Sequence, residues 1–122
     1  MLPIIFRQSK SADRTLKTMP HLALSAMRSG KGTFDDWETL ATRINIGVVL
    51  AARHFKDASE AMQGAVEAIQ SAHKRFTEAK RWGLSGDEFR AIGEALNLAD
   101  EIQEQCTRRE LRDAMLFVQS QM

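Results

Sequence analysis

The stretch 33–56 of this 122-residue chain constrains the fold most. Its apolar residues recur at the spacing of one helix face, and its second half is apolar nearly all round. Thr33 is followed three residues later by Asp36, which is the spacing of a capping box with Asp in place of Glu or Gln, and this predicts the helix start. Such a helix needs cover on both sides, from other elements or from a second subunit. The main stripe contains Trp37, Leu40, Ala41, Ile44, Val48, Ala51, Ala52 and Phe55.

The same start signal recurs three times farther along the chain. Each copy is a Ser, Thr or Asp followed three residues later by Glu, so that each side chain can bond the backbone amide of the other residue. An apolar stripe at helical spacing follows each copy, and each therefore predicts a new helix. The pairs are Asp57 with Glu60, Ser85 with Glu88, and Thr107 with Glu110.

Proline and glycine mark the remaining boundaries. Pro20 suits the first turn of a short helix reaching Arg28. Gly30 and Gly32 would end that helix, because glycine readily adopts the left-handed conformation of a helix stop. Gly83 would end the next long helix in the same way. No Pro occurs after position 20, so the rest of the chain contains no helix breaker of that kind.

These signals predict an all-α fold. We expect a compact bundle of roughly four to six helices around the central hydrophobic helix, because short turns favour antiparallel neighbours. Residues 1–19 show no helical period and are predicted to form an extended or flexible, basic N-terminal arm, whereas 20–122 form a single helical domain. The apolar segment 2–6 would form a short strand, or would dock on the body or on a neighbouring molecule.

Cysteine content and charge bound the setting. A single cysteine, Cys106, cannot form an internal disulfide, and no apolar run approaches the ~18 residues that cross a bilayer, so we expect a cytoplasmic protein with no membrane contact. Net charge is +1, but residues 1–32 carry six basic side chains and one acidic, against 11 basic and 15 acidic in the remainder. A basic arm could hold nucleic acid, although a solvated tail is the commoner explanation.

No residue pattern predicts catalysis or a cofactor. The possible metal ligands are not spaced as ligands are, so no metal or cofactor site is predicted. Asp100 and Glu104 share a helix face as a proton-transfer pair would, but a solvated acidic face is the simpler explanation. Cys106 lies near a helix start, which can lower a thiol pKa, yet a structural cysteine is the default. The ligand types considered are His21, His54, His73 and Cys106.

Two sets of residues are candidate binding surfaces. The first set is basic, and it would contact either the phosphates of a nucleic acid, with Trp82 stacking on a base, or a partner protein. The alternative is that Trp82 is packed in the protein and that the Lys and Arg side chains around it are solvated. The members of this set are Lys74, Arg75, Lys80, Arg81, Trp82, Arg108, Arg109 and Arg112. The second set is Ile46, Val49 and Leu50, on the opposite face of the central helix from its main stripe, and it makes a homodimer the expected oligomer.

A set of residues at the helix-turn positions between about 22 and 116 carries a resemblance to known proteins. The set consists of Ala26, Gly30-Lys31-Gly32, Asp36, Leu40 and Asn45, of Trp82-Gly83-Leu84-Ser85-Gly86-Asp87-Glu88, and of Leu98-Ala99-Asp100, Gln103, Cys106-Thr107, Glu110-Leu111 and Ala114. In these positions the chain resembles small helical accessory proteins of tailed phages and prophages of proteobacteria. The resemblance implies no catalytic residue.

The resemblance and the helical stripes together give a functional expectation. We expect a non-enzymatic protein that binds and inhibits a host protein or protein complex, with an anti-CRISPR or another anti-defence factor as the expected kind. The alternative is a nucleic-acid-binding regulator that uses the basic arm and the Lys and Arg clusters. An enzyme that uses Cys106, or Asp100 with Glu104, is the third hypothesis.

Overall fold

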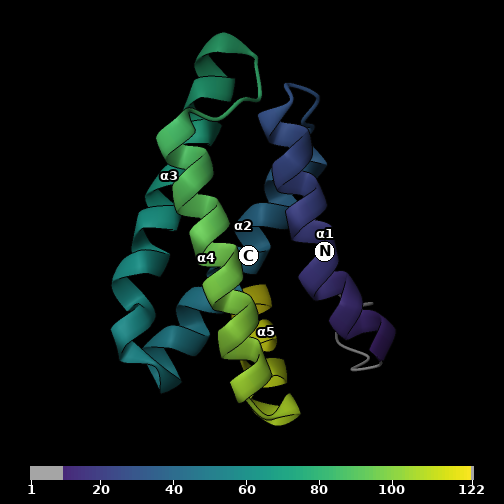
Figure 1. The fold of residues 1–122 in the computed structure, drawn as a ribbon, viewed down its shortest axis with the longest axis vertical. Coiled ribbons are helices and arrows are strands. Elements are labelled where there is room, and N and C mark those ends of the chain that lie inside the picture. The colour runs from purple at the N-terminus through teal and green to yellow at the C-terminus, as the bar shows by residue number, and fades with distance from the viewer. Residues whose placement is uncertain (1–9, 122) are drawn as a thin grey trace.

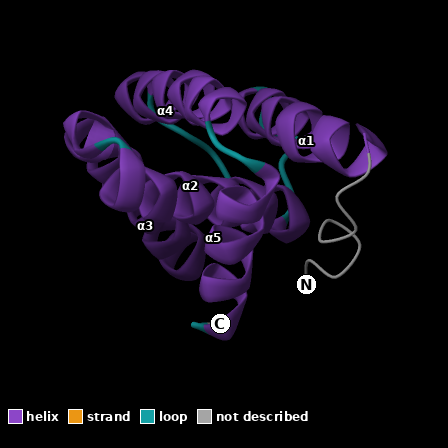
Figure 2. Cartoon of the chain, turned by 90° about the horizontal axis from the view of Figure 1, so that it is seen from below, coloured by secondary structure: helices purple, strands orange, loops and turns teal. Residues whose placement is uncertain are grey.

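The chain folds into five packed α-helices, shown in a computed structural model that describes residues 10–121, with side chains from Thr18 onward (Figure 1). Figure 2 shows only helices and loops in this part of the chain, so the predicted all-α class is confirmed. No helix among the described residues is long and apolar enough to cross a membrane. The elements are α1 (Lys10–Arg28), α2 (Phe34–His54), the short 3-10 helix η2 (Lys56–Ala58), α3 (Ser59–Ala79), α4 (Gly86–Gln105) and α5 (Arg108–Ser120).

Helix α2 packs against α1, α3, α4 and α5. Seen from below, α1 and α4 form one layer, and α2, α3 and α5 lie on the other side of it (Figure 2). Leu40, Ile44 and Leu50 of α2 are fully covered, as are Ile92 and Leu96 of α4. Burying several large aliphatic side chains, at roughly 1.5–3 kcal/mol each, is the main stabilising contribution to this bundle.

Three of the four predicted capping boxes are present. In each one the side-chain oxygen of the first residue accepts a hydrogen bond from the backbone amide three residues on, and that residue's carboxylate accepts one in return. They start α2, α4 and α5. The fourth is wrong: Asp57 lies in η2, and α3 begins at Ser59 after Ala58, which has no side-chain cap. The confirmed boxes are Thr33 with Asp36, Ser85 with Glu88, and Thr107 with Glu110.

The other boundaries follow the sequence in part. Gly30 has φ +81°, as predicted for the stop after α1. Helix α3 ends at Ala79, before the predicted stop at Gly83, and the capping residue Lys80 adopts the left-handed conformation with φ 57°. Helix α1 begins at Lys10, so Pro20 lies inside it and 10–19 are helical and not extended. The remaining arm residues, 1–9, with the apolar segment 2–6, lie outside the described residues.

The expected self-association residues are largely covered within the chain. Ile46 and Leu50 are each 0% exposed, and Val49 is partly buried and packs against the core. The prediction that Ile46 and Leu50 offer a free surface is wrong, because α2 has neighbours on more than one side. Gly47 lies between them and lets Met62 approach the α2 backbone closely. A homodimer stays a prediction, and it would have to form through another surface.

Candidate interaction surfaces and a buried ion cluster

Five rings gather at the end of the bundle where α2 begins and α3 ends. The Phe76 and Trp82 rings lie nearly parallel with centroids 4.1 Å apart. Trp37 stacks on Trp82 at 5.8 Å and meets the His73 ring at 4.9 Å. Phe34 stacks on Trp37 at 5.7 Å from the solvent side, with 48% of its surface exposed. Offset stacking at these distances adds about 0.5–1.5 kcal/mol per pair beyond area burial.

This packing decides between the two explanations of Trp82. Its side chain is only 7% exposed, and the Phe76 ring covers one face of it. Trp82 therefore belongs to the core and is not free to stack on a base. Phe34 and His73 are the exposed rings of this group, and the sequence position of Phe34 next to the capping Thr33 did not indicate its exposure.

Arg75 fastens the loop between α3 and α4. Its guanidinium donates two hydrogen bonds to the Glu88 carboxylate, at 2.9 and 2.8 Å, and one to the carbonyl of Gly83 at 2.9 Å. The bond from Arg75 is the main reason that the pKa of Glu88 lies below its ordinary value, and the same pair raises the pKa of Arg75. Arg75 is thus a structural residue, and the prediction that it contacts a partner loses its support.

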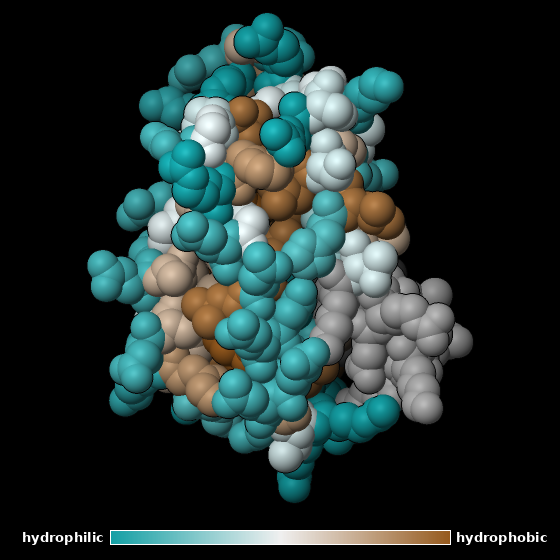
Figure 3. Space-filling model, viewed as in Figure 1, coloured by the Kyte–Doolittle hydropathy of each residue, from teal (hydrophilic) through white to brown (hydrophobic). Residues whose placement is uncertain are grey.

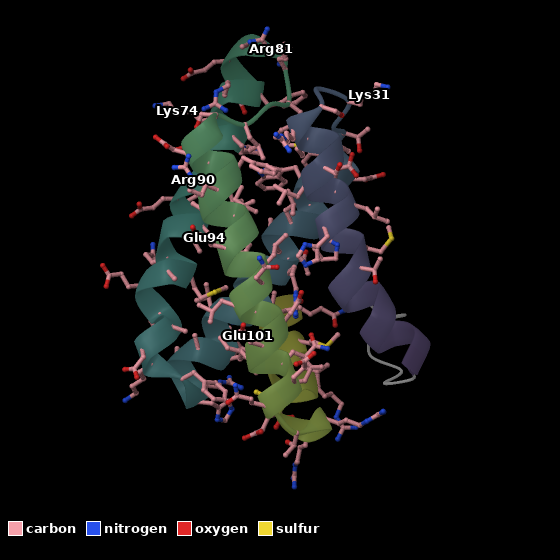
Figure 4. All side chains as sticks on the ribbon, in the orientation of Figure 1. Lys31, Lys74, Arg81, Arg90, Glu94 and Glu101 are labelled. Atoms are coloured by element: carbon pink, nitrogen blue, oxygen red, sulfur yellow. The ribbon has the colours of Figure 1, made fainter. Side chains whose placement is uncertain are left out.

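The structure does not bring the other predicted basic residues together. Lys74, Lys80 and Arg81 are exposed near the end of α3; Lys74 and Arg81 are labelled at the upper end in Figure 4. Helix α5, which carries Arg108, Arg109 and Arg112, lies in the lower half of the molecule (Figure 1). The sequence clusters therefore belong to two separate surfaces.

Helix α5 exposes apolar and basic side chains on the same side. Leu116 is 48% exposed and Phe117 is 44% exposed. The guanidinium carbon of Arg53, from the last turn of α2, lies 5.1 Å from the centre of the Phe117 ring. Arg109 and Arg112 precede Leu116 at helical spacing and are exposed. We call Arg53, Arg109, Arg112, Leu116 and Phe117 the α5 face.

An ion cluster around the buried Arg43 joins α1, α2 and α4. Arg43 of α2 is 1% exposed and donates from Nη2 to Oδ1 of Asp100 on α4, at 2.8 Å. The other oxygen of Asp100 lies 2.9 Å from Nε2 of His21 on α1. Burial lowers the pKa of Arg43, and the bond to Asp100 only partly opposes this. Nε and Nη1 of Arg43 have no hydrogen-bond partner among the described residues.

The cluster was missed by sequence reasoning, which considered Asp100 only as a partner of Glu104 and His21 only as a metal ligand. Asp100 is instead engaged by Arg43 and His21. One signal was available: Arg43 occupies a core position of α2, three residues after Leu40, where an apolar residue is expected. An arginine there needs an acidic partner, but its spacing does not say which one.

Cys106 has the environment of a structural cysteine. Its side chain is partly buried at the end of α4, and no disulfide involves it. Burial, with a smaller contribution from Glu110, raises the pKa of the thiol, which is opposite to the lowering that activates a nucleophile. Among the side chains that the structure describes, from Thr18 to Gln121, no three of His, Cys, Asp or Glu are grouped as metal ligands.

Two open hollows lie at opposite ends of the bundle. One, of about 460 Å³, is lined by the end of α2, the start of α3 and the second half of α4, and His54, Glu101 and Gln105 contribute polar groups to it. The other, of about 470 Å³, lies between the last residue of α1 and the start of α4. In Figure 3, which shows the molecule from the same side as Figure 1, apolar side chains are exposed between α4 and α1 in the upper half of the molecule.

Comparisons with known proteins give no family for this chain. No protein-family model matches it, and neither a curated protein nor a solved structure is similar enough to count as a match.

Proposed function

We propose that this chain is a non-enzymatic interaction protein that binds a partner protein through the α5 face. The observation that carries the proposal is the pair Leu116 and Phe117, two large apolar side chains that lie about half exposed beside arginines. Aromatic and arginine side chains dominate the binding energy of protein interfaces. A partner with acidic residues around an apolar anchor would be complementary to this face.

The proposal extends to a phage-type inhibitor of a host protein machine, with an anti-CRISPR or another anti-defence factor as the specific form. This extension depends on the resemblance to small phage and prophage proteins, and on a fold whose polar clusters hold helices together. Arg75 fixes the α3–α4 loop, and Arg43 joins α2 to α4. A protein of this kind inhibits by occupying a surface that the host machine needs, and requires rigidity more than chemistry.

The test compares two matched double variants in partner capture. Leu116→Ser with Phe117→Ser removes the apolar part of the α5 face, and Met19→Ser with Leu22→Ser removes equally exposed apolar side chains from α1. We expect the wild type and the α1 variant to retain one host protein from a bacterial lysate that the α5 variant loses. Plaque counts on hosts with and without an active CRISPR system then test the anti-defence form. Identical captured proteins for all three chains, with circular dichroism showing intact helices, would refute the α5 face as the binding site.

A nucleic-acid-binding role is the second candidate, and Phe34 is the observation that favours it. The ring is exposed at the start of α2, and Lys31, Lys74 and Arg81 are labelled at the upper end of the molecule in Figure 4. Bases stack on exposed rings in single-strand binding proteins, and cations contact the phosphates. Binding should weaken steeply with salt and depend on Phe34, so the absence of any gel shift at low salt would exclude it.

A further inference from the structure

The upper hollow combines positive charge with an apolar wall. It is open, measures about 470 Å³, and lies where α1 ends and α4 begins. Both charged side chains that line it within the described part of the chain are arginines. Its volume falls in the range of small-molecule sites, roughly 300–1,000 Å³, and exceeds what a single phosphate needs. The lining residues are Arg28, Leu84, Ser85, Gly86, Phe89 and Arg90.

Arg28 is held in place by an aromatic ring and not by an acid. Its guanidinium carbon lies 4.8 Å from the centre of the Phe89 ring. A guanidinium stacked flat on a ring keeps its N–H groups at its edges, where they can bind two oxygens of a phosphate side by side. No described carboxylate forms an ion pair with Arg28, so its charge is available to a ligand.

The two acidic residues at the start of α4, Asp87 and Glu88, do not neutralise the positive charge of the hollow. Asp87 pairs with Arg90 at 3.2 Å, but the Asp87 side chain is 96% exposed, and a pair in water is weak. Glu88 turns away to the Arg75 guanidinium and to the backbone of Ser85. Arg90 can therefore exchange its solvent-exposed partner for a ligand oxyanion, and two guanidinium groups match the charge of a phosphate dianion better than that of one carboxylate.

We propose that this hollow binds an organic phosphate whose phosphoryl group is joined to a flat ring. Arg28 and Arg90 bind the phosphoryl oxygens, and Leu84 and Phe89 pack against the ring. The chemistry is shared by a free mononucleotide and by the 5′-terminal nucleotide of a single strand. The site is separate from the α5 face, which lies in the other half of the molecule (Figure 1), so each proposal can fail without the other.

The first experiment titrates adenosine monophosphate into the full chain by calorimetry, with inorganic phosphate and adenosine as partial ligands. We expect saturable binding of the nucleotide and weaker binding of each part. Arg28→Gln and Arg90→Gln should each weaken nucleotide binding about tenfold or more, which corresponds to one charge-assisted contact. Phe89→Leu should weaken the nucleotide more than it weakens inorganic phosphate. Lys56→Gln, in η2 at the other end of the bundle, removes one exposed positive charge outside the hollow; it is the control and should leave the affinity unchanged.

The second experiment separates the two sources of the ligand. A short oligodeoxythymidine with a 5′-phosphate is compared with the same strand with a 5′-hydroxyl, by fluorescence anisotropy at low and at moderate salt. Tighter binding of the phosphorylated strand than of the mononucleotide identifies a strand end; the reverse identifies a free nucleotide. The proposal is overturned if the folded wild type binds neither, if inorganic phosphate binds as tightly as the nucleotide, or if Arg28→Gln and Arg90→Gln bind as the wild type does. Circular dichroism of each variant confirms that it is folded.

Discussion

Removing the carboxylate of Asp100 should leave a buried charge without its partner. In the wild type Arg43 is 1% exposed, and Asp100 supplies its ion pair at 2.8 Å. Burial already lowers the pKa of Arg43 even with Asp100 present, which means that the surroundings oppose the charged guanidinium. In Asp100→Ala, burial still disfavours the charged form of Arg43, and the carboxylate that stabilised this charge is gone. We therefore expect a large loss of stability when this one partly exposed carboxylate is removed.

The magnitude follows from the burial of the two partners. Removing one member of a buried pair destabilises by about 3–5 kcal/mol, and the Asp100 side chain is 24% exposed, so the lower end applies and we expect about 3 kcal/mol. For a chain of this size that is a fall in Tm of roughly 10 °C. The double variant Arg43→Met, Asp100→Ala removes the stranded charge and fills the core position with a flexible apolar side chain. It should recover about 2 kcal/mol relative to Asp100→Ala.

Urea unfolding at neutral pH measures these differences. Helix content by circular dichroism and tryptophan fluorescence should give coincident transitions, because a single domain of this size unfolds in one cooperative step and the tryptophans report the aromatic group at one end of the bundle. His21→Ala is the control, since His21 is 40% exposed and its loss should reduce stability by no more than about 1 kcal/mol. If the double variant is as unstable as Asp100→Ala, or if Asp100→Ala is within about 1 kcal/mol of the wild type, the stranded-charge reasoning is wrong.

Four other substitutions test local features. Gly64→Ala, at an exposed site of α3 with open space around it, should stabilise the protein by roughly 0.5–1 kcal/mol through helix propensity. Gly47→Ala should destabilise it by about 1 kcal/mol, because the new Cβ overlaps the Met62 methyl group in the core. Equal urea midpoints for the two variants would contradict the close packing at Gly47. Lys80→Gly should raise the unfolding free energy by roughly 0.5–1 kcal/mol, since only glycine adopts φ 57° without strain, and an unchanged thermal midpoint would count against it. The folded-state pKa of Glu88 is depressed, chiefly by the hydrogen bond from Arg75, so the ionised Glu88 stabilises the fold fully above its unfolded pKa of about 4.3. That stabilisation is lost as the pH falls through the folded-state pKa, so between about pH 5 and pH 2 the unfolding midpoint of Glu88→Gln should change less than that of the wild type. Equal changes in the two midpoints would refute this reasoning.

The candidate sites were predicted only in part. Sequence clusters drew attention to Trp82 and Arg75, but the first is packed beneath Phe76 and the second is paired with Glu88. The features that carry the proposals here, Phe117 on α5 and Arg28 on Phe89, were not singled out. Exposure of an aromatic side chain depends on which other helix covers it, and helical spacing alone does not supply that information.

The sequence by itself determined the helices whose starts are set by neighbours three residues apart. Thr33 with Asp36, and Ser85 with Glu88, form their hydrogen bonds wherever the rest of the chain lies, because both partners belong to the same first turn. Only the tertiary structure decided which acid joins Arg43, since Asp100 is 57 residues away. It also decided that Ile46 is buried and that two arginines face one hollow. Contacts of that kind arise when whole helices pack, so their partners cannot be deduced from spacing along one helix.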